Sequence, residues 1–258
     1  MSDLHPMAES PRLLPLGDAA LTVEFGSEID APTHAKVLGF TAALDEAQAM
    51  GALAGVAERV PTFRSVTVHF DPDQVDVEAL ATQLRELAQG SGSRSVAGVR
   101  WAVPFCCDTE FALDLADVAQ AKSMSAQAVL DLLTATVFQV YMLGFLPGFA
   151  FMGGLPQALE MPRLSSPRKR VPPGSVAIAL RLCGAYPWES PGGWRVLGRT
   201  PVPLFDPRLS GRPTLLAPGD EVRWRAVDRA EYDDIVDRVK TNRFDRAALQ
   251  VAAPAEAP

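Results

Sequence analysis

Glycine and proline are concentrated in one part of this 258-residue chain, and they limit what that part can form. Between Gly144 and Asp220, 24 of 77 residues are glycine or proline, against 17 of the other 181. So many turn-forming residues exclude long helices. The short apolar runs between the turns predict the strands of a β-barrel or sandwich, at residues 175–180, 194–197, 202–205 and 221–224.

The N-terminal third predicts a small α/β domain. Residues 20–25 form a short apolar run, and residues 65–70 alternate apolar with polar side chains, which indicates two strands. Residues 32–50 and 77–88 carry apolar side chains at helical spacing, the second behind Asp76 as the N-cap. The fold class is therefore α+β.

The stretch 90–95 has the composition of a linker and marks a domain boundary. We predict a disordered tail over 1–12, the α/β domain over 13–92, the barrel over 96–250 and a second disordered tail over 251–258. The barrel domain is expected to open with a strand at 99–105, followed by helices at 113–121 and from 125 to about 141. Residues 138–155 are apolar but interrupted by Pro147 and four glycines, and they predict a buried loop and turn.

Composition excludes several classes of protein. The net charge of −7 disfavours general binding to nucleic acid or to anionic membranes. Three cysteines, of which Cys106 and Cys107 are adjacent, form neither a disulfide framework nor a zinc pattern, and no metal is expected. Residues 1–12 do not resemble a signal peptide, so we expect a cytoplasmic protein.

The glycine- and proline-rich stretch inverts the charge balance. It holds nine Arg or Lys against four Asp or Glu. Arginine forks and glycine turns both bind anions, so the hypothesis is a site for a small anionic ligand. All three histidines lie in the first third of the sequence, which leaves acid–base chemistry here to Asp, Glu, Tyr186 or water. Cys183 is interpreted as a small apolar residue rather than a nucleophile.

Several longer motifs resemble one known family, that of the 5-oxoprolinase B subunit, also called the KipI or allophanate hydrolase subunit 1 family. In the second half the motifs are residues 140–149 (VYMLGFLPGF), 174–179 (GSVAIA), 190–194 (SPGGW), 198–201 (GRTP) and 204–207 (LFDP). In the first half they are residues 15–20 (PLGDAA), 23–26 (VEFG) and 61–65 (PTFRS). The resemblance spans nearly the whole chain.

The resemblance implies a cyclophilin-like β-barrel after the small α/β domain. It also implies a protein that works with the C and A subunits of the same enzyme to cleave 5-oxo-L-proline to L-glutamate at the expense of ATP. The ATP is expected to be shared with the partner subunits, with Mg as a candidate counterion. Two alternatives stay open: an inhibitor that binds a sensor histidine kinase, as KipI does, and half of a carboxyltransferase like that of urea carboxylase. Catalytic residues are not assigned.

The candidate substrate-binding residues follow from the charge pattern and the motifs together. Arginines are expected to hold anionic groups, the glycine turn to offer backbone donors, and Tyr186 or Asp206 to orient the substrate. The full set is Arg163, Arg168, Arg170, Ser175, Tyr186, Ser190, Gly192, Gly193, Arg199 and Asp206. The chain departs from the family pattern at Leu133, where a histidine is usual, and at residues 180–183, where polar residues are usual.

Overall fold

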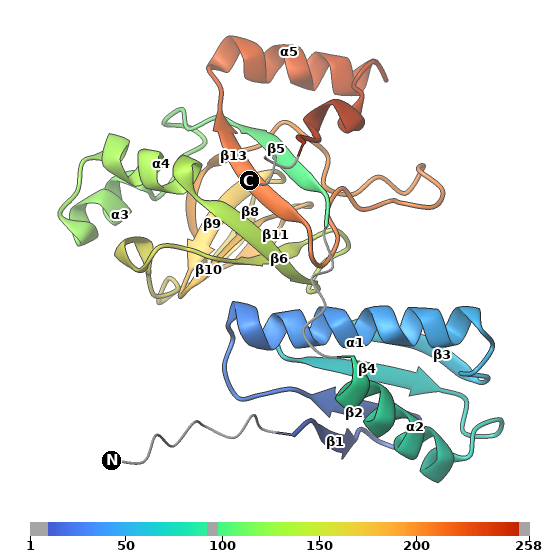
Figure 1. Ribbon diagram of the computed structural model, residues 1–258. Helices are drawn as coiled ribbons and strands as arrows, with labels where there is room; N and C mark the ends of the chain where they lie inside the picture. The colour runs from blue at the N-terminus through green and yellow to red at the C-terminus, as the bar shows by residue number, and fades with distance from the viewer. Residues whose placement is uncertain (1–9, 92–97, 253–258) are drawn as a thin grey trace, which may run out of the picture. The chain divides into compact units, whose positions relative to one another are not determined.

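A computed structural model describes residues 10–91 and 98–252 (Figure 1). The chain divides into two compact units, residues 1–96 and 97–258. The first is a small α/β unit and the second is built on a barrel-like sheet, so the predicted fold class is confirmed. Among the described residues, no helix has both the length and the apolar composition needed to cross a membrane.

The first unit is an antiparallel sheet of four strands with two helices. In spatial order the strands are β1 (Arg12–Pro15), β2 (Ala20–Glu24), β4 (Ser65–Phe70) and β3 (Val56–Pro61). The helices are α1 (Ala31–Ala49) and α2 (Val77–Gly90). Strand β4 buries Val66, Val68 and Phe70 as its alternation predicts. Asp76 caps α2, because its side chain accepts hydrogen bonds from the backbone N–H groups of Glu78 and Ala79.

The predicted tails are described only in part. Residues 1–9 and 253–258 lie outside the described residues, as do residues 92–97 of the predicted linker. Arg12, which the sequence assigns to the tail, is the first residue of β1 and pairs with Glu24. At the other end, the backbone N–H of Val251 donates to the carbonyl of Arg100 at 3.0 Å.

The second unit is built around a seven-stranded sheet (Figure 1). In spatial order its strands are β12 (Arg195–Arg199), β9 (Ser175–Ala179), β10 (Leu182–Ala185), β7 (Ala150–Gly153), β6 (Val137–Leu143), β13 (Glu221–Ala226) and β5 (Arg100–Phe105). Neighbours pair antiparallel, except that β13 and β5 are parallel. Cys106 and Arg199 exchange two backbone hydrogen bonds of 2.8 Å, which link the ends of the two edge strands and nearly close the sheet.

Helices and a short ribbon complete this unit. The helices are α3 (Leu115–Lys122), α4 (Ala126–Ala135) and α5 (Arg229–Lys240), with short 3-10 turns η1 (Gln157–Leu159) and η2 (Arg246–Leu249). The ribbon pairs β8 (Arg168–Val171) with β11 (Ser190–Gly192). The barrel core includes Phe105, Phe138, Met152, Ile178 and Trp224.

Three local predictions are wrong. The helix expected to reach residue 141 ends at Ala135, because Thr136 and Val137 are β-branched and Val137 pairs with Arg223 of β13. Residues 138–155 form most of β6 and all of β7 rather than a loop. The run 202–205 makes only an isolated bridge, from Phe205 to Thr214, since the neighbouring prolines cannot donate ladder hydrogen bonds.

Candidate functional site

One concave surface of the second unit collects four of the ten predicted site residues. It is a pocket of about 270 Å³, here called the aromatic pocket. Arg163, Tyr186, Gly192 and Gly193 are the predicted residues that line it. The rest of its wall is made by Phe145, Phe149, Phe151, Pro167, Pro191 and Trp194.

The aromatic pocket lies on the side of the sheet opposite the barrel core. Side chains alternate along β7 and the residue before it, so that Ala150 and Met152 enter the barrel core while Phe149 and Phe151 belong to a second apolar cluster. Strand β9 is buried on both faces, because its alternate side chains pack in the barrel core and in the second apolar cluster. Phe149 is the centre of this cluster, with its ring centroid 5.1 Å from that of Tyr186 and 5.7 Å from that of Trp194. Both contacts are edge-to-face, the geometry that aromatic quadrupoles favour.

Tyr186 is held as a neutral phenol. Burial raises the pKa of its hydroxyl, while the backbone N–H of Trp194 and the guanidinium groups of Arg163 and Arg168 act in the opposite direction. Because the net effect is a raised pKa, the hydroxyl keeps its proton at neutral pH and can donate a hydrogen bond to a ligand oxygen. It cannot serve as a base there.

Gly192 is required beside this hydroxyl. A Cβ added at Gly192 would lie 2.4 Å from the Tyr186 hydroxyl oxygen, closer than side chains approach. At Gly193, by contrast, the nearest atom to an added Cβ is Pro167 Cγ at 3.6 Å. The first glycine of the SPGGW motif therefore makes room for the tyrosine.

Arg163 supplies the positive charge of the aromatic pocket. Its side chain is exposed, and no carboxylate of the described residues lies within 4.0 Å of its guanidinium. A guanidinium fork at the edge of an apolar pocket is suited to binding the carboxylate or phosphate of a ligand in two-pronged fashion.

Arg168 has a different environment. Its guanidinium donates to both carboxylate oxygens of Asp114, at 2.6 and 2.9 Å. Asp114 is 1% exposed and also accepts a hydrogen bond of 2.7 Å from the backbone N–H of Val196. Arg168 thus ties ribbon strand β8 to the residue that precedes α3 and to barrel strand β12, and its charge is already matched.

The other predicted residues lie elsewhere. Arg170 forms an exposed ion pair with Glu189 at 3.5 Å. The guanidinium of Arg199 lies 4.5 Å above the ring of Phe111. Asp206 binds Arg208, whose hydrogen bonds lower the pKa of the Asp206 carboxyl to about 2, and it lines a separate hollow. Ser175 and Ser190 are buried in β9 and β11 and do not line the aromatic pocket.

The basic residues of the glycine- and proline-rich stretch therefore do not share one anion site, contrary to the hypothesis from the charge pattern. Most are neutralised locally, by the pairs Arg168–Asp114, Arg170–Glu189, Arg181–Glu160, Arg195–Asp117, Arg208–Asp206 and Arg212–Asp220. Only Arg163 among them lines the aromatic pocket.

The positions that depart from the family pattern do not line the aromatic pocket either. Leu133 is fully buried in the barrel core. Cys183 is buried there too, and burial raises the pKa of its thiol to about 12, so the interpretation of Cys183 as a small apolar residue is confirmed. Leu180 is exposed on the surface.

The aromatic residues of the pocket were not identified from the sequence as site residues, because apolar residues near turns are usually core residues. The signal lay in the motifs themselves, since Phe145 and Phe149 belong to VYMLGFLPGF and Trp194 to SPGGW. In the folded chain these two motifs, 41 or more residues apart, face one cavity. No group of three His, Cys, Asp or Glu side chains within residues 10–91 and 98–252 is placed to hold a metal ion.

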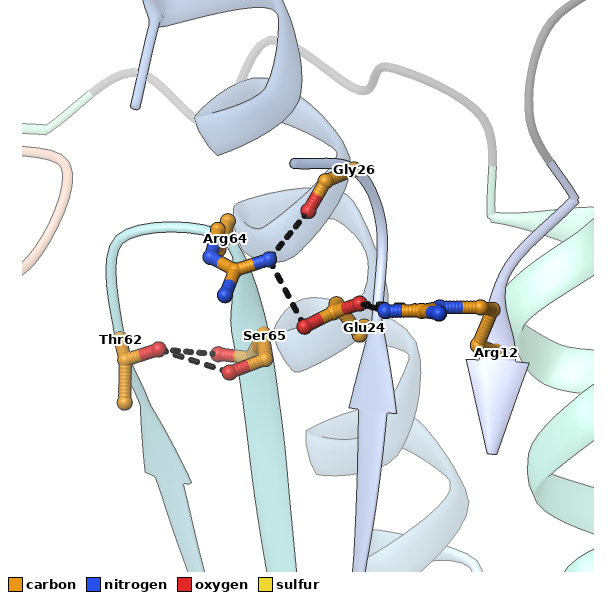
Figure 2. A network of polar contacts seen from close by, with 6 residues as sticks. All are labelled: Arg12, Glu24, Gly26, Thr62, Arg64 and Ser65. Carbon is orange, nitrogen blue, oxygen red and sulfur yellow. Dashed lines mark hydrogen bonds and ion pairs between the residues drawn. The ribbon is translucent and has the colours of Figure 1, made fainter. Parts of the chain in front are cut away.

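Two motifs of the first unit also meet, but at a structural contact (Figure 2). Glu24 of VEFG forms an ion pair with Arg64 of PTFRS at 2.8 Å, and the same nitrogen of Arg64 donates to the carbonyl of Gly26 at 2.8 Å. Arg12 binds Glu24 from the other side through its Nε, at 3.0 Å. The hydrogen bond from Arg12 and the nearby charge of Arg64 lower the pKa of Glu24.

Comparison with known proteins places the chain in a family. The model of the carboxyltransferase domain, subdomain C and D, matches residues 11–216. The B subunit of the 5-oxoprolinase of Bacillus subtilis (strain 168) is 36% identical over 228 residues, which cover 84% of this chain and 93% of that protein.

Two solved structures share the fold. The crystal structure of TTHA0988 is 32% identical with a TM-score of 0.70, covering 81% of this chain and 40% of that one, so this chain spans less than half of that protein. The urea carboxylase of Kluyveromyces lactis is 20% identical with a TM-score of 0.74, covering 91% of this chain and 23% of that one. The resemblance inferred from the motifs is confirmed, and the chain belongs to the family of carboxyltransferase domains, subdomains C and D, that includes the B subunit of 5-oxoprolinase.

Proposed function

We propose that this chain is the B subunit of a cytoplasmic, ATP-dependent 5-oxoprolinase, which works in a complex with the A and C subunits to convert 5-oxo-L-proline to L-glutamate. The name of the Bacillus subtilis relative, at 36% identity over 93% of its length, supports the assignment. The observation that carries it here is the aromatic pocket, in which one exposed guanidinium and one protonated phenol border an apolar cavity of amino-acid size.

The pocket chemistry suits a small cyclic carboxylate. Arg163 would bind the carboxylate of 5-oxo-L-proline, and the Tyr186 hydroxyl would donate to its ring carbonyl. The rings of Phe149 and Trp194 would pack against the ring methylenes. Hydrolysis breaks the ring C–N bond, and one water supplies one oxygen to the new carboxylate and the two protons that convert the amide N–H into an ammonium group.

Coupling to ATP is expected because the ring amide is stabilised by resonance. In this proposal the ATP and Mg²⁺ of the reaction are bound by the complex of subunits rather than by this chain alone. The glycine turns of the sequence do not have the P-loop pattern that binds nucleotide phosphates. The role of this chain is to bind and orient the substrate.

The proposal is tested by reconstitution. The chain is co-expressed with the A and C subunits, and glutamate formation from 5-oxo-L-proline is measured with and without ATP. We expect activity that requires ATP and is lost when this chain is omitted. Full activity in the absence of this chain would contradict the proposal and would favour the kinase-inhibitor or carboxyltransferase alternative.

A further inference from the structure

The backbone at Phe145 is strained. Its φ is +69°, a backbone angle that residues other than glycine rarely adopt. The N–H of Leu146 donates to the carbonyl of Gly144 at 2.8 Å, which makes a three-residue γ-turn centred on Phe145. With positive φ this turn is the rare, strained form, and a bulky aromatic residue is unfavourable at its centre.

The loop around Phe145 keeps this conformation in place. The N–H of Gly144 donates to the carbonyl of Phe149 at 3.1 Å, and the N–H of Phe149 donates to that of Leu146 at 3.0 Å. The indole N–H of Trp188 donates to the carbonyl of Pro147 at 3.3 Å. These contacts fix the loop that joins β6 to β7 on both sides of Phe145, so the strain is maintained by the surrounding structure.

The side chain of Phe145 gains little from core packing. It is 65% exposed, whereas its neighbour Phe149 is 2% exposed. The two rings meet edge to face at 5.7 Å, which leaves most of the Phe145 ring in contact with water at the wall of the aromatic pocket. A strained backbone that presents an exposed aromatic ring to a cavity points to a ligand contact rather than to a role in folding.

We infer that Phe145 is the specificity-determining residue of the aromatic pocket and selects cyclic carboxylates with an apolar ring face. This inference rests on the proposed function, because it takes the aromatic pocket as the substrate site. With Arg163 holding the carboxylate, the Phe145 ring covers the ring face of the substrate and is itself removed from water. An open-chain product such as glutamate would place a second carboxylate or an ammonium group in this apolar wall, and the cost of removing its water disfavours binding.

The test compares three variants in the reconstituted enzyme. Phe145→Gly removes the ring and allows φ of +69° without strain. Phe145→Tyr keeps the ring. Leu180→Gly is the matched control, because Leu180 is also exposed, has φ of +54° and lies outside the aromatic pocket.

We expect Phe145→Gly to raise KM for 5-oxo-L-proline roughly tenfold with kcat within about twofold of wild type, as expected when an apolar wall of a binding site is lost. Phe145→Tyr and Leu180→Gly should keep KM within about threefold. Circular dichroism and thermal unfolding confirm that each variant is folded. An unchanged KM in folded Phe145→Gly, or the same rise in Leu180→Gly, would overturn the inference while leaving the proposed function intact.

A wild-type complex that forms no glutamate would instead overturn the proposed function. The role of Phe145 is then decided by calorimetric titration of the chain with 5-oxo-L-proline, cyclopentanecarboxylate and L-glutamate. Tighter binding of the two cyclic carboxylates to wild type, lost in Phe145→Gly, supports the inference. No binding to wild type, or equal binding to both proteins, overturns it.

Discussion

Arg168 and Asp114 are 54 residues apart in sequence and form a two-pronged ion pair, with nitrogen–oxygen distances of 2.6 and 2.9 Å. Because Asp114 is almost fully buried and also binds the backbone of Val196, this pair holds the ribbon and the barrel together. The arginine nearest to Arg163 in sequence thus serves the scaffold, whereas Arg163 itself lines the aromatic pocket.

Removal of Asp114 should therefore destabilise the fold. Asp114→Ala leaves the guanidinium of Arg168 and the N–H of Val196 without an acceptor, and loss of one partner of a buried pair costs about 3 kcal/mol. Urea unfolding measures the change. As the control, Glu189→Ala breaks the exposed pair with Arg170 and should change stability by less than about 0.5 kcal/mol. Equal effects of the two substitutions would show that the Asp114 pair is not structural.

The two glycines of the SPGGW motif should respond differently to alanine. Gly192→Ala places a methyl group 2.4 Å from the Tyr186 hydroxyl oxygen, so the tyrosine or the ribbon must move. We expect a loss of about 1–3 kcal/mol in stability, as for other overpacked sites, together with weaker substrate binding. Gly193→Ala meets its nearest atom at 3.6 Å and should fold like wild type. Indistinguishable unfolding curves for the two variants would contradict this account of Gly192.

Stability should fall at alkaline pH, in part through Cys183. Burial raises the pKa of this thiol from 9.0 to about 12. The unfolded chain loses this proton at lower pH than the folded chain. The contribution of the buried thiol to the free energy of unfolding is therefore complete below pH 9 and is lost progressively between about pH 9 and pH 12. Between about pH 8 and pH 11 the expected loss from this group is about 3 kcal/mol.

Urea unfolding at these two pH values checks the alkaline loss. In Cys183→Ala the decrease should be smaller than in wild type by that amount, while the remainder comes from groups such as Tyr186 and Tyr232, whose pKa values burial also raises. A variant that loses as much stability as wild type would exclude the thiol as a cause.

Local features of the fold could be predicted from sequence, whereas contacts between distant residues could not. Asp76 begins helix α2 and residues 65–70 form β4, because capping and alternation act over a few residues. Residues 137–143 carry enough apolar residues for either a helix or a strand, and pairing with β13 decides for the strand.

In the candidate site too, local features could be predicted from sequence and contacts between distant residues could not. Its glycines and Tyr186 could be found from the turn motifs, but the aromatic wall depends on which face of β7 is covered by a second apolar cluster. The charge count suggested many ligand-binding arginines. It could not show that Arg168 would find Asp114, or that Arg170 would find Glu189, because such pairs depend on the folded positions of both partners.

Arg163→Met in the reconstituted enzyme tests most directly whether Arg163 binds the carboxylate of the substrate in the aromatic pocket. Arg170→Met, which removes an exposed charge outside the pocket, is the matched control. A hydrogen bond to a charged group contributes about 1.5–3 kcal/mol, so its loss predicts a KM for 5-oxo-L-proline raised about 10- to 150-fold in Arg163→Met, with Arg170→Met close to wild type. A KM that is unchanged in folded Arg163→Met, or raised equally in both variants, would contradict the account.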